Sequence, residues 1–74
     1  MKLKLFVKNN CPQCRMTEQL LKQLKIDYVV ENITENDGLR AKLRSEGYLQ
    51  TPVVITSETS WTGFRPDRIK ELVQ

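Results

Sequence analysis

Apolar and polar residues alternate at the start of the chain and then change to a helical spacing. Leu3, Leu5 and Val7 alternate with polar or outward residues, which predicts a strand with one fully apolar face. From residue 12 to about residue 25 the apolar residues recur every four positions. This spacing predicts a helix whose inner stripe consists of Met16, Leu20, Leu21 and Leu24. Residues 26–33 predict a second strand, because they contain the β-branched and aromatic residues Tyr28, Val29, Val30 and Ile33.

The second half of the chain predicts one more helix, a hairpin and a final helix. Thr34 is the expected N-cap of a helix that faces inward through Leu39, Ala41 and Leu43, with Gly47 as its left-handed cap. Residues 51–56 predict a buried strand, 57–58 a turn, and 59–61 a returning edge strand. Pro66 begins the last helix, which has Phe64 and Ile69 at the spacing of a hydrophobic staple and an inner face of Ile69, Leu72 and Val73.

This order of elements predicts an α/β fold in a single domain covering residues 1–74. The first strand–helix–strand unit is expected to be parallel, and the hairpin antiparallel, which gives a four-stranded mixed sheet flanked by three helices. The net charge of +3 comes from 12 basic and 9 acidic residues that are interleaved, which argues against nucleic-acid binding. No apolar run reaches the roughly 18 residues of a membrane span, and the first four residues open a strand rather than a signal peptide. We therefore expect a cytoplasmic protein without a membrane partner.

The two cysteines of the chain stand three positions apart, between the first strand and the first helix. Pro12 suits the first helical position, which makes Cys11 the N-cap residue. There the helix amides and dipole stabilise a thiolate over a thiol. Cys14 follows one turn later on the same side, where it can form a disulfide with Cys11. The pattern favours redox chemistry in which Cys11 attacks and Cys14 resolves.

Other readings of the two cysteines remain open at this point. A structural disulfide would close a four-residue loop and add only about 2 kcal/mol of stability. A zinc or iron–sulfur site would need a dimer, because the chain has no His and only two Cys. Two unrelated core cysteines, or a non-catalytic interaction domain, are further alternatives.

Several segments together resemble the thioredoxin/glutaredoxin superfamily over nearly the whole chain. The resemblance rests on the order of elements, on Cys11-Pro12-Gln13-Cys14 after a strand, and on Thr51-Pro52-Val53-Val54 before a hairpin. Lys8 completes the K-x-x-C-P-x-C pattern of glutaredoxins. The segment from Trp61 to Asp67, W-T-G-F-R-P-D, is similar to the W-S-G-F-R-P-D signature of the NrdH-redoxins, as is the R-S-E-G-Y segment at residues 44–48. The chain departs from that subfamily at Pro12, which is the glutaredoxin choice, and mildly at Thr62.

The resemblance implies a thioredoxin fold, no bound cofactor or metal, and a reversible Cys11–Cys14 disulfide. It also implies a monomeric carrier that takes electrons from thioredoxin reductase to class Ib ribonucleotide reductase. A glutathione-dependent glutaredoxin is the alternative. It is disfavoured because Gln13 is not aromatic and because a single Gly63 stands where glutaredoxins have a Gly-Gly turn.

The resemblance further implies a cis Thr51–Pro52 peptide that brings Thr51 beside Cys11, where it can pair with a substrate segment. We expect Phe64 in a packed, hydrogen-bonded loop, a partly exposed Trp61, and Arg65 bonded to carbonyl groups or to solvent. The residues expected to contact partners are Lys8, Pro12, Gln13, Thr51, Pro52, Trp61, Gly63, Phe64 and Arg65.

Overall fold

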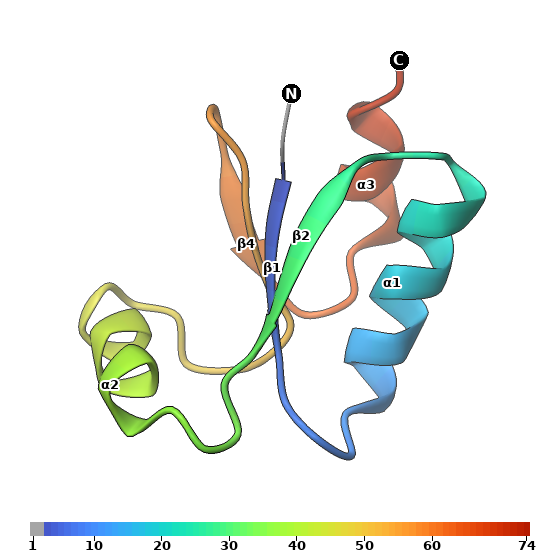
Figure 1. Ribbon diagram of the computed structural model, residues 1–74. Coiled ribbons are helices and arrows are strands. Elements are labelled where there is room, and N and C mark those ends of the chain that lie inside the picture. The colour runs from blue at the N-terminus through green and yellow to red at the C-terminus, as the bar shows by residue number, and fades with distance from the viewer. Residues whose placement is uncertain (1–2) are drawn as a thin grey trace.

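The computed structural model describes residues 3–74 and contains the seven elements in the predicted order (Figure 1). They are β1 (Leu3–Val7), α1 (Pro12–Gln23), β2 (Tyr28–Asn32), α2 (Asp37–Ser45), β3 (Val53–Ile55), β4 (Ser60–Thr62) and α3 (Pro66–Glu71). The β2 and β3 strands are shorter than predicted, and β4 begins one residue later. The order confirms the predicted α/β architecture.

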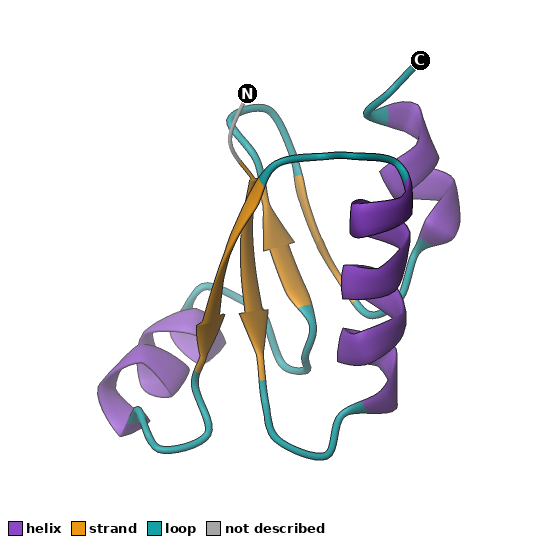
Figure 2. Ribbon diagram, turned by 45° about the vertical axis from the view of Figure 1, so that its right-hand side comes forward, coloured by secondary structure: helices purple, strands orange, loops and turns teal. Residues whose placement is uncertain are grey.

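The four strands form one mixed sheet in the order β2-β1-β3-β4. β1 runs parallel to β2 and antiparallel to β3, and β4 returns antiparallel beside β3. Helices α1 and α3 cover one face of the sheet, and α2 covers the other (Figures 1 and 2). This arrangement is the thioredoxin fold that the resemblance implied.

Each face of the sheet has its own apolar core. The larger core cluster lies between the sheet and helices α1 and α3. It includes Leu5, Leu21, Val54 and Ile69, all almost inaccessible to solvent. The opposite face holds a smaller cluster of Phe6, Ile33, Leu43 and Val53 beneath α2. The period-2 pattern of β1 explains this division, because Leu3, Leu5 and Val7 belong to the first cluster and Phe6 to the second.

The N-cap of α2 differs from the prediction. Asn36, not Thr34, caps the helix: its side-chain oxygen accepts a hydrogen bond of 3.0 Å from the Leu39 N–H. The Thr34 hydroxyl instead accepts a bond of 2.8 Å from the Asn9 N–H and so ties the end of β1 to the end of β2. Gly47, by contrast, is the left-handed cap of α2 as predicted, with φ of +98°.

Three apolar residues assigned to inner helical faces are exposed. Met16 is 44% exposed because the buried stripe of α1 runs through Cys14, Thr17 and Leu21. Ala41 stands two residues from both Leu39 and Leu43 and therefore points away from the sheet. Val73 is 52% exposed because α3 ends before it, at Glu71.

Candidate redox site

Cys11 sits at the N-terminus of α1, directly after a sharp turn that follows β1. Asn10 makes this turn with a positive φ of 57°, a conformation that Asn tolerates better than most residues. Cys11 itself is extended and caps the helix, and its Sγ accepts a hydrogen bond of 3.2 Å from the Cys14 N–H. Pro12 occupies the first turn. The local structure is the one the sequence predicted.

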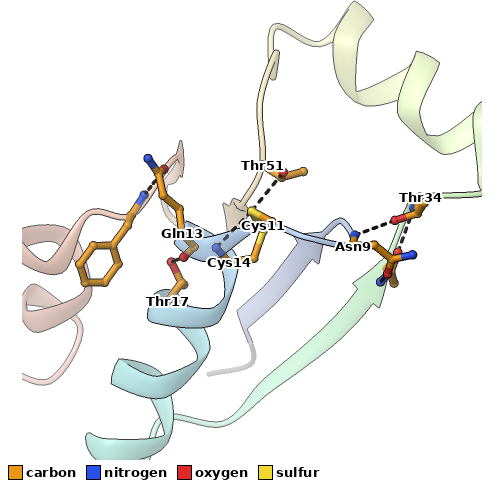
Figure 3. Close-up of a disulfide and its surroundings, with 9 residues drawn as sticks. Asn9, Cys11, Gln13, Cys14, Thr17, Thr34 and Thr51 are labelled. Atoms are coloured by element: carbon orange, nitrogen blue, oxygen red, sulfur yellow. Dashed lines mark hydrogen bonds between the residues drawn. A yellow bond between two sulfur atoms is a disulfide. The ribbon is translucent and has the colours of Figure 1, made fainter.

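The two cysteines form a disulfide with a Cα–Cα distance of 5.2 Å (Figure 3). Their surroundings differ. Cys14 is only 3% exposed and belongs to the larger core cluster, whereas Cys11 is half-buried at the surface. An approaching molecule therefore meets the Cys11 sulfur before it can reach Cys14.

Thr51 faces the disulfide from the loop before β3, and Pro52 follows it in that loop. The peptide bond between them is cis, as predicted. The Thr51 Oγ1 lies 3.6 Å from the Cys11 Sγ (Figure 3). Because a disulfide sulfur has no proton, the Thr51 hydroxyl is the donor in this contact. Pro52 is fully buried.

The loop after β4 is tied to the redox site by two hydrogen bonds. The Gly63 N–H donates to the Pro52 carbonyl at 2.9 Å, and the Phe64 N–H donates to the Gln13 Oε1 at 3.2 Å. Gly63 has a φ of +83°, and a Cβ there would lie 3.5 Å from the Gln13 Oε1. Phe64 packs against the larger core, which confirms the packed, hydrogen-bonded loop. Gln13 thus has a structural partner, the Phe64 N–H, that no sequence pattern indicates.

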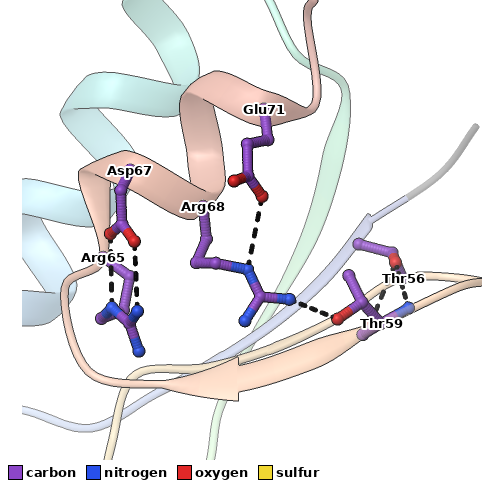
Figure 4. A network of polar contacts seen from close by, with 6 residues as sticks. All are labelled: Thr56, Thr59, Arg65, Asp67, Arg68 and Glu71. Carbon is purple, nitrogen blue, oxygen red and sulfur yellow. Dashed lines mark hydrogen bonds and ion pairs between the residues drawn. The ribbon is translucent and has the colours of Figure 1, made fainter.

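Trp61 is buried, with 6% of its surface exposed, and the expected partial exposure was wrong. It pairs with Val54 in the centre of the hairpin, and the Arg68 guanidinium lies 5.0 Å from its ring. Arg68 is held there by Glu71 and by the Thr59 hydroxyl (Figure 4). The indole therefore belongs to the core and not to an exposed docking surface. Sequence reasoning did not identify Arg68.

Arg65 was expected to bond to carbonyl groups or to solvent; it is exposed to solvent and pairs with a carboxylate, not with carbonyl groups. Two of its guanidinium nitrogens donate to Asp67 at 3.1 and 3.3 Å (Figure 4). The hydrogen bonds from Arg65 lower the pKa of Asp67, and the same pair raises the pKa of Arg65. This exposed pair holds the first turn of α3 where the loop enters the helix.

Lys8, Pro12 and Gln13 are exposed around Cys11 and line one surface hollow with it. Lys8 therefore lies at the rim of the redox site, as its place in the motif suggested. Within residues 3–74, no group of three or more His, Cys, Asp or Glu side chains is placed to hold a metal ion. None of the helices in this range is long and apolar enough to cross a membrane.

Comparison with known proteins assigns the chain to a family. The family model for glutaredoxins matches residues 3–61. Over 72 residues the chain is 35% identical to the glutaredoxin-like protein NrdH of Escherichia coli K12, covering 97% of this chain and 89% of the relative. It is 31% identical over 68 residues to NrdH of Lactococcus lactis subsp. cremoris, covering 92% and 94%.

The chain belongs to the NrdH-redoxins of the glutaredoxin family. The solved structure of NrdH-redoxin from Escherichia coli matches it with a TM-score of 0.91 at 35% identity, over 97% of this chain and 95% of the other. A glutaredoxin from Archaeoglobus fulgidus matches with a TM-score of 0.82 at 26% identity, over 97% and 85%. The NrdH relatives, the fold and the Cys11–Cys14 disulfide support a dithiol–disulfide redox carrier.

Proposed function

We propose that this NrdH-redoxin carries electrons from thioredoxin reductase to a class Ib ribonucleotide reductase in the cytoplasm. It acts as a monomer without a bound cofactor, and its working part is the Cys11–Cys14 pair. One observation carries the proposal: a disulfide lies at a helix N-terminus with only Cys11 within reach of solvent.

The position of each sulfur suits one step of disulfide exchange. In the reduced carrier the Cys11 thiolate attacks one sulfur of the partner disulfide, forms a mixed disulfide and expels one partner thiolate. Cys14 then loses its proton and attacks Cys11, which restores the Cys11–Cys14 bond and expels the second partner thiolate. Two electrons pass to the partner, and its two thiolates take up two protons. The reductase reverses the process with two electrons from NADPH.

The helix N-terminus supports the first step. The Cys14 N–H that bonds to the Cys11 sulfur at 3.2 Å favours the anionic form of that sulfur. The Thr51 hydroxyl, 3.6 Å away, adds a second donor. Thr51 also offers its backbone beside Cys11, where an extended partner segment can pair with it as an added strand. Pro12 and Pro52 hold the two sides of this contact in place.

The proposed electron donor is supported by the relatives and by the loop after β4. The NrdH-redoxin from Escherichia coli is described as a glutaredoxin-like protein with a thioredoxin-like activity profile. In this chain the segment from Trp61 to Arg65 occupies the place where glutaredoxins bind glutathione, and it is filled by packed and hydrogen-bonded groups. We therefore propose thioredoxin reductase as donor, with Gly63, Phe64 and Arg65 close to its docking site.

The test compares two electron donors on one protein-disulfide substrate. NADPH oxidation is followed with thioredoxin reductase, and separately with glutathione and glutathione reductase, each with the wild-type chain and with Cys11→Ser. We expect turnover with thioredoxin reductase, its loss in Cys11→Ser, and little turnover with glutathione. Turnover with glutathione and glutathione reductase, but not with thioredoxin reductase, would contradict the proposed donor and favour the glutaredoxin alternative.

A metal-binding dimer makes different predictions for the purified protein. It would elute at twice the monomer mass and carry zinc or an iron–sulfur chromophore, which Cys11→Ser would remove. A metal-free monomer with two titratable thiols after reduction is the result that the carrier requires.

A further inference from the structure

A surface groove lined by cations adjoins the redox site. Lys8 follows β1 at one side, and Arg40 and Arg44 lie one turn apart on α2 at the other. The floor continues along the segment before β3. We call this surface the basic groove and define it by Lys8, Arg40, Arg44, Leu49, Gln50 and Thr51.

The groove has an excess of positive charge. Among residues 3–74, no acid lines the basic groove itself, and the one acid of the adjoining hollow that shares Lys8, Arg40 and Arg44 is Asp37, which is already paired with Arg40. Lys8 and Arg44 form no ion pair with any residue in the described range 3–74. Lys8, Arg40 and Arg44 carry three positive charges and Asp37 carries one negative charge, so the local net charge is +2. This positive charge attracts carboxylates.

The basic groove is continuous with the surface around Cys11. The hollow that contains Cys11 is also lined by Lys8, Leu49, Gln50 and Thr51. Figure 3 shows the segment between α2 and β3 reaching Thr51 directly beside Cys11. A polypeptide that is bonded to Cys11 and paired with Thr51 therefore has one of its two ends over the basic groove.

Leu49 adds an apolar contact to this surface. It is 73% exposed, although it lies between the disulfide and the arginines. An exposed leucine flanked by unpaired cations fits a segment that carries both apolar and acidic side chains.

We propose that the basic groove binds an acidic segment next to the reactive cysteine of the partner protein. The inference rests on the proposed carrier function and names the chemistry of its partner. Carboxylates of that segment pair with Lys8 and Arg44, and an apolar side chain covers Leu49. A polypeptide is the occupant because the groove opens onto the sulfur that exchanges with disulfides.

The experiment uses two synthetic peptides with the same internal disulfide. One carries two Glu residues on each side of the cysteines, and the other carries Gln at the same positions. The second-order rate constant for reduction of each peptide is measured with the reduced protein at low ionic strength. We expect wild type to reduce the acidic peptide about threefold to tenfold faster. The preference should approach one in 0.5 M salt, because salt screens exposed charges.

Substitutions then locate the preference. Arg44→Gln and Lys8→Gln should each lower the ratio of the two rate constants toward one. Lys42→Gln is the matched control: it removes the same charge from α2, two residues from Arg44 and off the groove. It should keep the wild-type ratio. The neutral peptide serves as an internal reference for general damage to the protein.

The outcomes separate the inference from the carrier function. Equal rates for the two peptides, a preference that survives Arg44→Gln, or an equal loss in Lys42→Gln would overturn the inference and leave the carrier function standing. Failure to reduce either peptide would overturn both.

Discussion

The Phe64 backbone N–H donates to the Gln13 side-chain oxygen at 3.2 Å, which joins the redox motif to a loop 51 residues later in the chain. We expect Gln13→Ala to lower the free energy of unfolding by about 0.5–1 kcal/mol, because one exposed hydrogen bond is lost. Gln13→Glu keeps an acceptor at this place and should remain within about 0.5 kcal/mol of wild type. Urea unfolding of the three oxidised proteins measures the differences. Equal stability of the Ala variant and wild type would show that the bond does not hold the loop.

Gly63 is required by its backbone conformation. With φ of +83°, Gly63→Ala should cost about 1–2 kcal/mol of unfolding free energy. Gly47→Ala is the matched control, since Gly47 has φ of +98° but a Cβ there would meet nothing within 4 Å. Both variants should lose stability in urea, and only Gly63→Ala should also slow turnover with thioredoxin reductase. Slower turnover in both would assign the effect to general instability.

Much of the redox site was accessible from the sequence because it depends on local rules. Cys11 as N-cap, Pro12 in the first turn and Cys14 one turn later all follow from helix geometry. The cis bond before Pro52 was predicted only through the resemblance, since most X-Pro bonds are trans. The basic groove was not foreseen, because it joins Lys8, which follows β1, to residues of α2 and of the loop before β3.

The failed predictions concern residues whose position depends on tertiary contacts. Trp61 was expected to be partly exposed, but Arg68 of α3 covers its ring. Thr34 has the chemistry of an N-cap, yet Asn36 stands nearer the helix and takes the role. The exposed Val73 lies beyond a helix end that sequence periodicity does not locate.

The Thr51 hydroxyl should affect the reactivity of Cys11 in the reduced protein. It lies 3.6 Å from the Cys11 sulfur and can donate to the thiolate. Thr51→Val should slow alkylation of Cys11 by iodoacetamide at pH 7 by about threefold, and Thr51→Ser should retain most of the rate. Mass spectrometry identifies the modified cysteine. A Ser variant as slow as the Val variant would mean that the methyl group, and not the hydroxyl, is responsible.

Tyr28 should make stability depend on alkaline pH. Burial, and then its hydrogen bond to Glu18, raises the pKa of Tyr28 to about 12. A raised pKa stabilises the folded state below the ordinary tyrosine pKa of about 10, and this stabilisation is lost as the pH rises toward 12. Wild type should exceed Tyr28→Phe in urea midpoint at pH 9, and the difference should shrink between pH 10 and 12. A difference that stays constant over this range would contradict the assignment.

The most direct test of the redox mechanism is to trap its intermediate. Reduced Cys14→Ser lacks the sulfur that resolves the mixed disulfide, and it is incubated with a disulfide-containing partner protein. The adduct is identified by non-reducing electrophoresis and peptide mass spectrometry. We predict a one-to-one mixed disulfide through Cys11 that dithiothreitol releases, and no such adduct with Cys11→Ser. An equally abundant adduct of Cys11→Ser through Cys14, or the absence of any adduct with Cys14→Ser, would contradict the assignment of Cys11 as the attacking residue.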